Sequence, residues 1–329
     1  MKDPATKKAL LSRLIALACT VLLLAFLIFH YDWRLVWSAF GRARWGPLLL
    51  AGVVLVFSHL LGVTDRWRRI LRLVGVSVSF REAWVMRMGG APLKFFTPLR
   101  VGELLRLPYL SRQHGLTADL TLGALGFEKV TFLTGLLPAL LLRGVLYGEI
   151  ASLVSAFAVV LVLVIATAAE SRELMLRLLA PFGERVTTWG RGLLAAFANA
   201  GLSGVFGQVI YAAIILACEA VVLALCLQSV GVEIDFARWW TVLPGVLLAG
   251  LAPVTFAGLG AREAALVVLF PHETPAALIA GGILFFVLAR LAIAVAGLPW
   301  MPEYLRRMVE PSLCARHVVR GINNGRAIP

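Results

Sequence analysis

The sequence predicts an all-α polytopic membrane protein, with about six transmembrane helices and two broken, re-entrant hairpins. The 329 residues are 60% hydrophobic and only 15% charged, with a mean hydropathy of +0.89. Soluble domains are about 45–50% apolar and roughly a quarter charged. Long apolar runs recur along the chain, and two more apolar stretches are interrupted by proline and glycine. This composition excludes a soluble enzyme.

Six uninterrupted runs match the roughly 20 apolar residues that a helix needs to cross a bilayer. They are 14–29, 46–63, 120–142, 150–169, 202–228 and 276–298. The first follows a basic start, as in a signal peptide, but no small-residue cleavage site comes after it. We therefore expect an uncleaved span.

Two apolar stretches, 84–110 and 240–270, are broken and predict re-entrant hairpins. The breaks carry helix-interrupting residues: Pro98 and Gly102 in the first stretch, and Pro253, Gly258 and Gly260 in the second. Backbone groups freed at such breaks cannot face lipid, so they must be buried in protein or line a wet cavity. Each hairpin is expected to enter and leave on the same side of the membrane.

The distribution of basic residues gives the orientation. With a cytoplasmic N-terminus and six crossings, 21 of the 31 Lys and Arg residues fall in cytoplasmic segments and 5 in external ones. This is the bias of cytoplasmic loops in membrane proteins. It predicts that both termini are cytoplasmic, with a short basic tail at 301–329. The net charge of +13 is then explained without nucleic acid as a partner.

The same layout predicts an inverted repeat. Residues 1–142 and residues 143–300 each read span, span, hairpin, span, and an odd number of crossings gives the two repeats opposite orientations. The first hairpin would open to the cytoplasm and the second to the outside. In secondary transporters with this plan, the substrate site lies where the broken segments meet.

Both breaks carry arginine and glutamate, which makes them candidate substrate-binding sites. The first motif contains Arg100, Glu103 and Arg106, and the second contains Arg262 and Glu263. A helix start beside an arginine suits a phosphate or a carboxylate. Glutamate in these motifs is expected either to cap the turn or to pair across the repeats. The alternative is that these charges neutralise each other and hold the hairpin tips together.

Other ionisable residues lie within apolar runs, where a charge needs an internal partner. Glu128 lies in the third span, and Glu219 and Arg290 project to the middle of the fifth and sixth. We expect Glu219 and Arg290 to form a structural pair, with proton coupling or substrate contact as the alternative. Arg87 and Lys94 are expected to reach back to the cytoplasmic interface.

The cluster Arg66-Trp67-Arg68-Arg69 ends the second span. A tryptophan anchor with positive-inside residues is the favoured interpretation, and binding of a lipid headgroup is the alternative. The four cysteines and five histidines show no metal-ligand spacing, so we expect no metal and no cofactor. No nucleotide-binding or hydrolase motif occurs either.

The two motifs, with Gly126–Lys129 and Arg66–Leu71, resemble the lysylphosphatidylglycerol synthase transmembrane (flippase-like) family over roughly residues 10–300. The matching positions are Pro98, Gly102, Glu103, Arg106, Glu128, Pro253, Gly258, Gly260, Arg262 and Glu263. The family often has Arg after the glutamate and an Asp three residues after that Arg, whereas this chain has Lys129 and Phe132.

The resemblance implies that the chain moves a lipid between the leaflets of a bacterial inner membrane. Only about 30 residues follow the last span, so we expect no aminoacyl-transfer domain and no enzyme activity. The alternative is a non-catalytic subunit that presents lipid to a separately encoded synthase or glycosyltransferase. A membrane enzyme using Glu103 or Glu263 as a base ranks last. Membrane lipids are the expected partners, and the sequence leaves the oligomeric state open.

Overall fold

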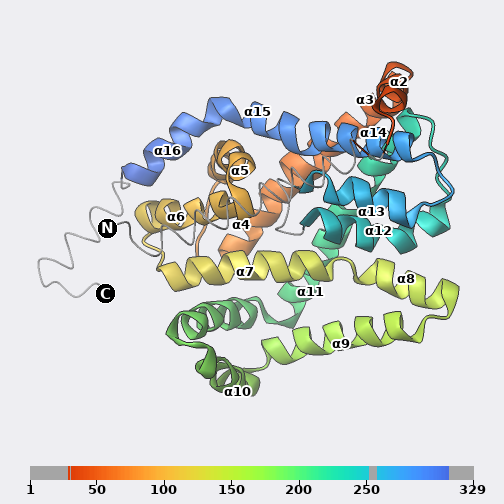
Figure 1. Ribbon diagram of the computed structural model, residues 1–329. Helices are drawn as coiled ribbons and strands as arrows, with labels where there is room; N and C mark the ends of the chain where they lie inside the picture. Colours follow the sequence, from red (N-terminus) through yellow and green to blue (C-terminus); the bar gives the residue numbers. More distant parts are fainter. Residues whose placement is uncertain (1–28, 30, 252–257, 311–329) are drawn as a thin grey trace, which may run out of the picture.

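The computed structural model describes residues 29, 31–251 and 258–310, and all regular structure in these residues is helical. The predicted span 14–29, apart from its last residue, lies outside the described residues, as does Pro253. Figure 1 shows long helices side by side, with shorter helices at their ends.

The elements follow one another in two groups. The first group comprises α2 (Trp33–Gly41), α3 (Trp45–Leu55), the π-helix η1 (Val56–Gly62), α4 (Val63–Leu73), α5 (Phe80–Phe96), the 3₁₀ segment η2 (Pro98–Leu105), α6 (Arg106–His114), α7 (Ala118–Thr134) and α8 (Leu137–Tyr147). The second comprises α9 (Ile150–Thr167), α10 (Ala169–Leu179), η3 (Ala180–Phe182), α11 (Glu184–Ser229), α12 (Phe236–Leu251), α13 (Ala261–Leu269), α14 (Pro275–Phe286), the π-helix η5 (Val287–Ala292), α15 (Ile293–Gly297), η6 (Leu298–Trp300) and α16 (Met301–Val309).

Five helical segments are long and apolar enough to cross a membrane. They are Trp45–Leu73, Ala118–Tyr147, Ile150–Thr167, Val186–Ser229 and Pro275–Val309. Each of the five predicted spans after the first overlaps one of them. Four segments are longer than predicted because the helix continues past its apolar part as amphipathic turns. The chain is therefore a polytopic all-α membrane protein, as predicted.

The longest segment, α11, is two helices joined at a kink. Gly201 has φ 61° and ψ 177°, which are not helical angles. The predicted span 202–228 begins directly after this glycine. The part of α11 before the kink packs along α7, and the part after it continues across the molecule toward α3 (Figure 1). The predicted span 202–228 therefore corresponds to the part of α11 after the kink, within the longer candidate span Val186–Ser229.

Both predicted hairpins are broken helix pairs, with bounds that differ from the predicted 84–110 and 240–270. The first runs from Phe80 to His114 and comprises α5, η2 and α6. In the second, α12 and α13 pack against each other on either side of the break. Hydropathy missed the first turns of α5 and α12 because charged residues lie there: Arg81, Glu82 and Arg238.

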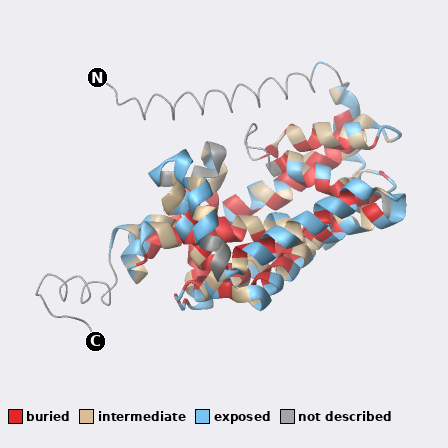
Figure 2. Cartoon of the chain, turned by 90° about the horizontal axis from the view of Figure 1, so that it is seen from below, coloured by how far each residue is buried: buried red, intermediate tan, exposed pale blue. Residues whose placement is uncertain are grey.

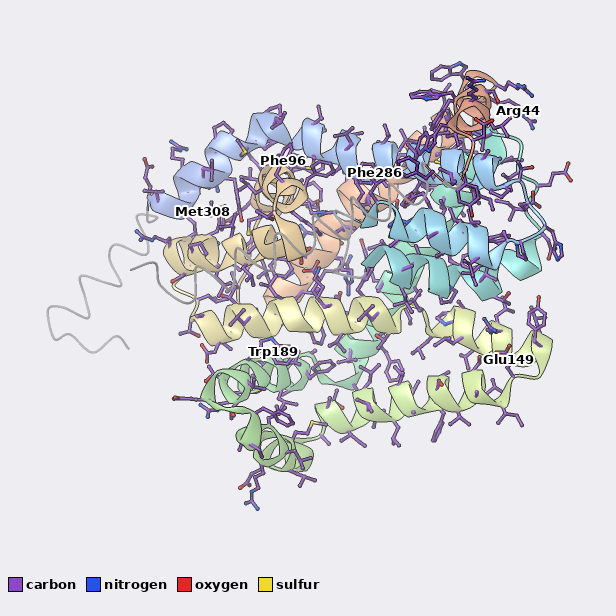
Figure 3. All side chains as sticks on the ribbon, in the orientation of Figure 1. Arg44, Phe96, Glu149, Trp189, Phe286 and Met308 are labelled. Carbon is purple, nitrogen blue, oxygen red and sulfur yellow. The ribbon has the colours of Figure 1, made fainter. Side chains whose placement is uncertain are left out.

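The two ends of the bundle carry different parts of the chain. Helices α6, α10 and α16, which belong to the predicted cytoplasmic segments, lie together at the left end in Figure 1. Helix α2 and the connection from α8 to α9, which belong to the predicted external segments, lie at the right end. There Glu149, which is labelled in Figure 3, accepts two hydrogen bonds from Arg143, at 2.7 and 2.8 Å. These bonds lower the pKa of Glu149.

Large apolar side chains cover much of the outer surface. Buried residues, red in Figure 2, lie mainly where helices face one another, and the outer turns are exposed. On α9, Phe157 is 69% exposed and Val154 is 59% exposed. Such a surface is stable against lipid tails and costly in water. The apolar excess of the sequence therefore serves both the interior and the lipid-facing surface.

The start of the first hairpin gives a simple test of its local stability. Ser79 precedes α5, and its hydroxyl accepts a hydrogen bond from the Glu82 backbone N–H at 3.2 Å. We expect Ser79→Ala to lower the unfolding free energy by about 1 kcal/mol, as for other N-cap serines. The matched control is Ser77→Ala, because Ser77 is exposed and precedes the cap. Equal stability of the two variants in mixed-micelle unfolding would contradict this role.

Candidate functional site

A cavity of about 740 Å³ lies inside the bundle, lined by residues from both predicted repeats. This volume falls within the range of pockets that bind small molecules or headgroups. Its charged lining consists of Arg66, Arg87, Lys94, Glu103, Arg106, Glu128, Lys129, Glu219, Arg262 and Arg290, together with His59. Seven of these side chains are basic and three are acidic, so the cavity carries a net charge of +4 with histidine neutral.

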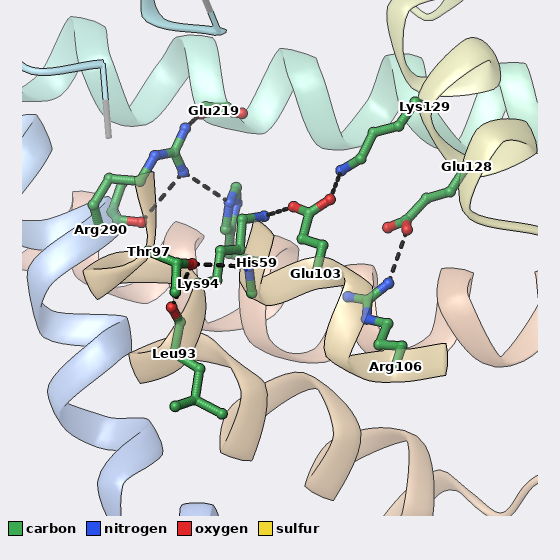
Figure 4. Close-up of polar contacts among 12 residues, drawn as sticks. His59, Leu93, Lys94, Thr97, Glu103, Arg106, Glu128, Lys129, Glu219 and Arg290 are labelled. Atoms are coloured by element: carbon green, nitrogen blue, oxygen red, sulfur yellow. Dashed lines mark hydrogen bonds and ion pairs between the residues drawn. The ribbon is translucent and has the colours of Figure 1, made fainter. Parts of the chain in front are cut away.

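A tight turn places Glu103 in the cavity. Thr97 Oγ1 donates to the Leu93 carbonyl at 2.7 Å and accepts from the Gly102 N–H at 2.8 Å, which ends α5 and folds η2 back on it (Figure 4). A Cβ on Gly102 would lie 2.6 Å from the Lys94 backbone N, so only glycine fits this approach. Glu103 lies in η2, and the helix after the break begins at Arg106.

Glu103 is held between two lysines. Its Oε1 pairs with Lys94, and its Oε2 lies 2.6 Å from Lys129 Nζ (Figure 4). The carboxylate is buried, whereas the Lys129 side chain is 43% exposed. Lys129 is one of the positions where the chain departs from the family pattern, and here it pairs directly with Glu103. It ties the first hairpin to α7.

A second ion pair joins the same two elements. Arg106 Nη1 lies 2.9 Å from Glu128 Oε2, and its guanidinium stacks 4.3 Å from the Trp67 ring centroid. Arg66 donates to the Glu128 carbonyl at 3.2 Å and to Thr131 Oγ1 at 2.6 Å. Glu128 and Lys129 are neighbours in sequence, so α7 offers the hairpin one negative and one positive partner.

The cluster at the end of the second span divides into two parts. Arg66 and Trp67 are buried, at 2% and 1% exposed. Arg68 and Arg69 pair with Asp65 at 2.7 Å each, nearer the surface. The interpretation of the whole cluster as an interfacial anchor was therefore wrong for its first two residues, because Arg66 lines the cavity and Trp67 lies in the apolar core.

The predicted pair between Glu219 and Arg290 forms, with Arg290 Nη2 2.7 Å from Glu219 Oε1. Arg290 Nη1 also lies 3.3 Å from His59 Nε2 (Figure 4). His59 lies in η1 and Arg290 in η5, and π-helical turns of this kind are frequent at functional sites. Sequence reasoning missed His59. Its signal was an ionisable residue inside the apolar run 46–63.

The second motif contributes one cavity residue and one structural residue. Arg262 is 1% exposed, lines the cavity and stacks 4.5 Å from the Phe285 ring centroid. Glu263 instead accepts a hydrogen bond from the Gly260 N–H at 2.5 Å, which caps the start of α13. Glu263 was predicted to bind substrate, and this geometry assigns it to the helix cap, one of the two roles expected for glutamate in these motifs.

The remaining predicted residues serve the backbone or lie outside the description. Pro98 begins η2, and Gly258 and Gly260 have φ of +83° and +88° at the second break. The side chain of Arg100 and all of Pro253 lie outside the described residues.

Arg87 and Lys94 were wrongly predicted to reach the cytoplasmic interface. Arg87 is 9% exposed, and both residues line the cavity. Each lies on α5, which packs against η2, α15 and α16, so their charges serve the interior. No periodicity in the sequence could show this, because the direction of α5 depends on its packing against distant helices.

The family comparison agrees with these motifs. A family model described as the lysylphosphatidylglycerol synthase TM region matches residues 13–304. No protein with a curated description matches the chain. The matched range contains all the cavity residues of both predicted repeats. This chain therefore belongs to the family of the lysylphosphatidylglycerol synthase transmembrane region.

Proposed function

We propose that this protein is a flippase-like transporter that moves a lipid with an anionic headgroup between the two leaflets of a bacterial cytoplasmic membrane. The observation that carries the proposal is the cavity with seven basic and three acidic side chains. Buried positive charge of this size calls for a negative ligand. Family membership supports a role in lipid modification or transport. The proposal assigns binding and movement of lipid to the chain, with no bond-making step.

Apolar residues at the rim of the cavity favour a lipid over a soluble anion. Leu104, Leu133 and Trp189 line the cavity, yet they are 45%, 45% and 39% exposed. Trp189 lies on the first part of α11, on the side of α7 (Figure 3), and a Cβ on Gly126 of α7 would lie 3.3 Å from its ring. An exposed apolar rim lets acyl chains stay in the bilayer while the headgroup enters the charged cavity.

The ion pairs between the first hairpin and α7 supply a candidate moving part. Glu103–Lys129 and Arg106–Glu128 are the pairs that join them. An anionic headgroup competes with the two glutamates for these cations, so binding would weaken the link. Rocking of one predicted repeat against the other would then carry the headgroup across. The charge bias of the sequence supports a cytoplasmic position for the end formed by α6, α10 and α16.

Reconstitution in liposomes tests the proposal. We expect the pure protein to accelerate leaflet exchange of labelled phosphatidylglycerol or of another anionic lipid. Glu103→Ala and Arg262→Ala are expected to lower this rate by about tenfold or more, because each removes a charged cavity contact. Glu173→Ala is the matched control, because Glu173 lies on α10 with its side chain 76% exposed.

Two results would overturn the proposal. One is the absence of exchange by the folded wild-type protein across anionic, zwitterionic and polyprenyl-phosphate lipids. The other is a wild-type rate in both cavity variants. The first result, with a partner protein recovered from gently solubilised membranes, would favour the alternative role of presenting lipid to a separate enzyme.

A further inference from the structure

Arg87 is the basic cavity residue whose charge the described part of the chain leaves uncompensated. It lies in the middle of α5, is 9% exposed and lines the cavity. Within the described residues it forms no ion pair or hydrogen bond, and its buried Nε has no acceptor. A buried arginine without an acceptor is costly, since its charge has lost water and gained nothing in return.

Neighbouring arginines and lysines differ from Arg87 in this respect. Arg106 pairs with Glu128, Arg290 pairs with Glu219, and Arg66 donates to Thr131. Lys94 and Lys129 share Glu103. Each of these five residues therefore contacts a carboxylate or a hydroxyl acceptor, whereas Arg87 contacts neither in the described part of the chain.

The carboxylates whose charges act on Arg87 are already paired with other cations. Glu103 and Glu128 both attract Arg87 electrostatically, and Arg106 and Arg290 repel it. Glu128 is 2.9 Å from Arg106, and Glu103 lies between its two lysines. Neither glutamate forms an ion pair with Arg87, and each is paired with another cation. A negative group from outside the chain would satisfy it.

A second unsatisfied donor lies beside Arg87. Arg87 and Tyr304 line one small recess, whose other charged residues are Lys94, Arg106 and Glu103. Tyr304 of α16 is fully buried, and its hydroxyl has no hydrogen-bond partner in the described part of the chain. The Tyr304 ring stacks on Tyr109 at 5.3 Å, which fixes its direction. The recess has about 10 Å³ of free volume, which is room for one oxygen atom.

We propose that Arg87 and Tyr304 bind one phosphate group, with an anionic oxygen in the recess between them. An arginine fork matches phosphate, and a tyrosine O–H donates to the same kind of oxygen. That this phosphate belongs to a lipid headgroup rests on the proposed function. Inorganic phosphate has the same chemistry, so the test separates the two sources.

The test measures binding to the purified full-length protein in nanodiscs. The probes are dioctanoyl phosphatidylglycerol, sodium phosphate, and a neutral dioctanoyl glycolipid without phosphate. Arg87→Gln is expected to weaken binding of the phosphatidylglycerol about 10- to 100-fold, and Tyr304→Phe about 3- to 10-fold. Arg81→Gln is the matched control, because Arg81 lies on the same helix and is exposed. We expect it to bind like the wild type.

Stability without ligand provides an independent measurement. If Arg87 is a binding residue, removing its uncompensated charge raises the unfolding temperature of the empty protein or leaves it unchanged. A lower unfolding temperature, with ligand affinity intact, would make Arg87 structural and overturn the inference. Wild-type affinity in Arg87→Gln would overturn it as well. Tyr304→Phe keeps the ring packing, so its result does not depend on the fold being disturbed.

The source of the phosphate follows from the same experiment. Binding of phosphatidylglycerol but not of sodium phosphate assigns the site to a lipid headgroup, and tight binding of sodium phosphate assigns it to the free anion. Equal binding of the neutral glycolipid overturns the phosphate site. If phosphatidylglycerol binds through Arg87 but is not moved between leaflets, the proposed function fails and this site stands. If lipid is moved between leaflets and Arg87→Gln has no effect on binding, the proposed function stands and this site fails.

Discussion

Replacement of Glu128 by alanine is expected to lower the unfolding free energy by about 3–5 kcal/mol. The Glu128 carboxylate lies 2.9 Å from Arg106, and the two side chains are 9% and 7% exposed. Removing the carboxylate leaves the Arg106 charge buried without its partner, in a part of the protein that water reaches poorly. The measurement is reversible unfolding in mixed micelles, followed by intrinsic tryptophan fluorescence.

An exposed ion pair gives the control for this prediction. Arg177 and Glu173 also pair, at 2.6 Å, with side chains 74% and 76% exposed. Glu173→Ala is expected to change the free energy by less than about 1 kcal/mol. Similar losses of unfolding free energy in Glu128→Ala and Glu173→Ala would show that burial does not determine the cost of removing one partner of an ion pair.

A double variant separates stability from transport. Arg106→Met with Glu128→Leu replaces the buried pair by apolar side chains of similar size, and such replacements often keep or raise stability. We expect the double variant to recover most of the stability lost in Glu128→Ala. Transport is still expected to be lost, because both cavity charges are gone. Recovered transport would mean that the pair only holds the hairpin in place.

The second large effect is expected from Gly258→Ala, which should lower the unfolding free energy by about 2–5 kcal/mol. Gly258 has φ of +83°, which an L side chain adopts at a cost of about 1–2 kcal/mol. A Cβ there would also lie 2.3 Å from the Gly250 carbonyl oxygen of α12. That clash would push α12 away from the second break and so move Arg262, which lines the cavity.

Gly231→Ala is the control for the glycine prediction. Gly231 has φ of +88°, and a Cβ there would meet no atom within 4 Å. It therefore isolates the conformational cost, which we expect to be about 1–2 kcal/mol. The same mixed-micelle unfolding measures both variants. If Gly258→Ala were no worse than Gly231→Ala, the close approach to Gly250 would not matter for stability.

Much of the architecture could be predicted from the sequence because it depends on local properties. An apolar run of 20 residues favours the membrane wherever the rest of the chain lies, and proline or glycine breaks a helix at its own position. Three predicted breaks illustrate this: Pro98, Gly102 and Gly258 all fall at or beside observed interruptions. The predicted starts of the hairpin helices were too late in the sequence, because their charged first turns are not part of the apolar runs from which the helices were predicted.

The site could be predicted only in part. Glu103, Arg106, Glu128, Arg262, Glu219 and Arg290 were found because a charge in an apolar run is conspicuous, and all six line the cavity. Which charges meet is a different question. Lys129 reaches Glu103 from 26 positions along the chain, and Arg290 lies against His59 from 231 positions away. No local pattern specifies such contacts.

The sequence by itself therefore determined that this is a multi-pass helical membrane protein with two broken segments that carry charges. Only the tertiary structure decided that Glu263 caps its own helix and that Arg66 and Arg87 turn inward. It also decided that Arg87 and Tyr304 share a recess in which the described chain leaves both unsatisfied. The physical reason is that membrane insertion and helix breaking depend on the residues of one segment. Compensation of a charge instead depends on the distances between segments that the fold brings together.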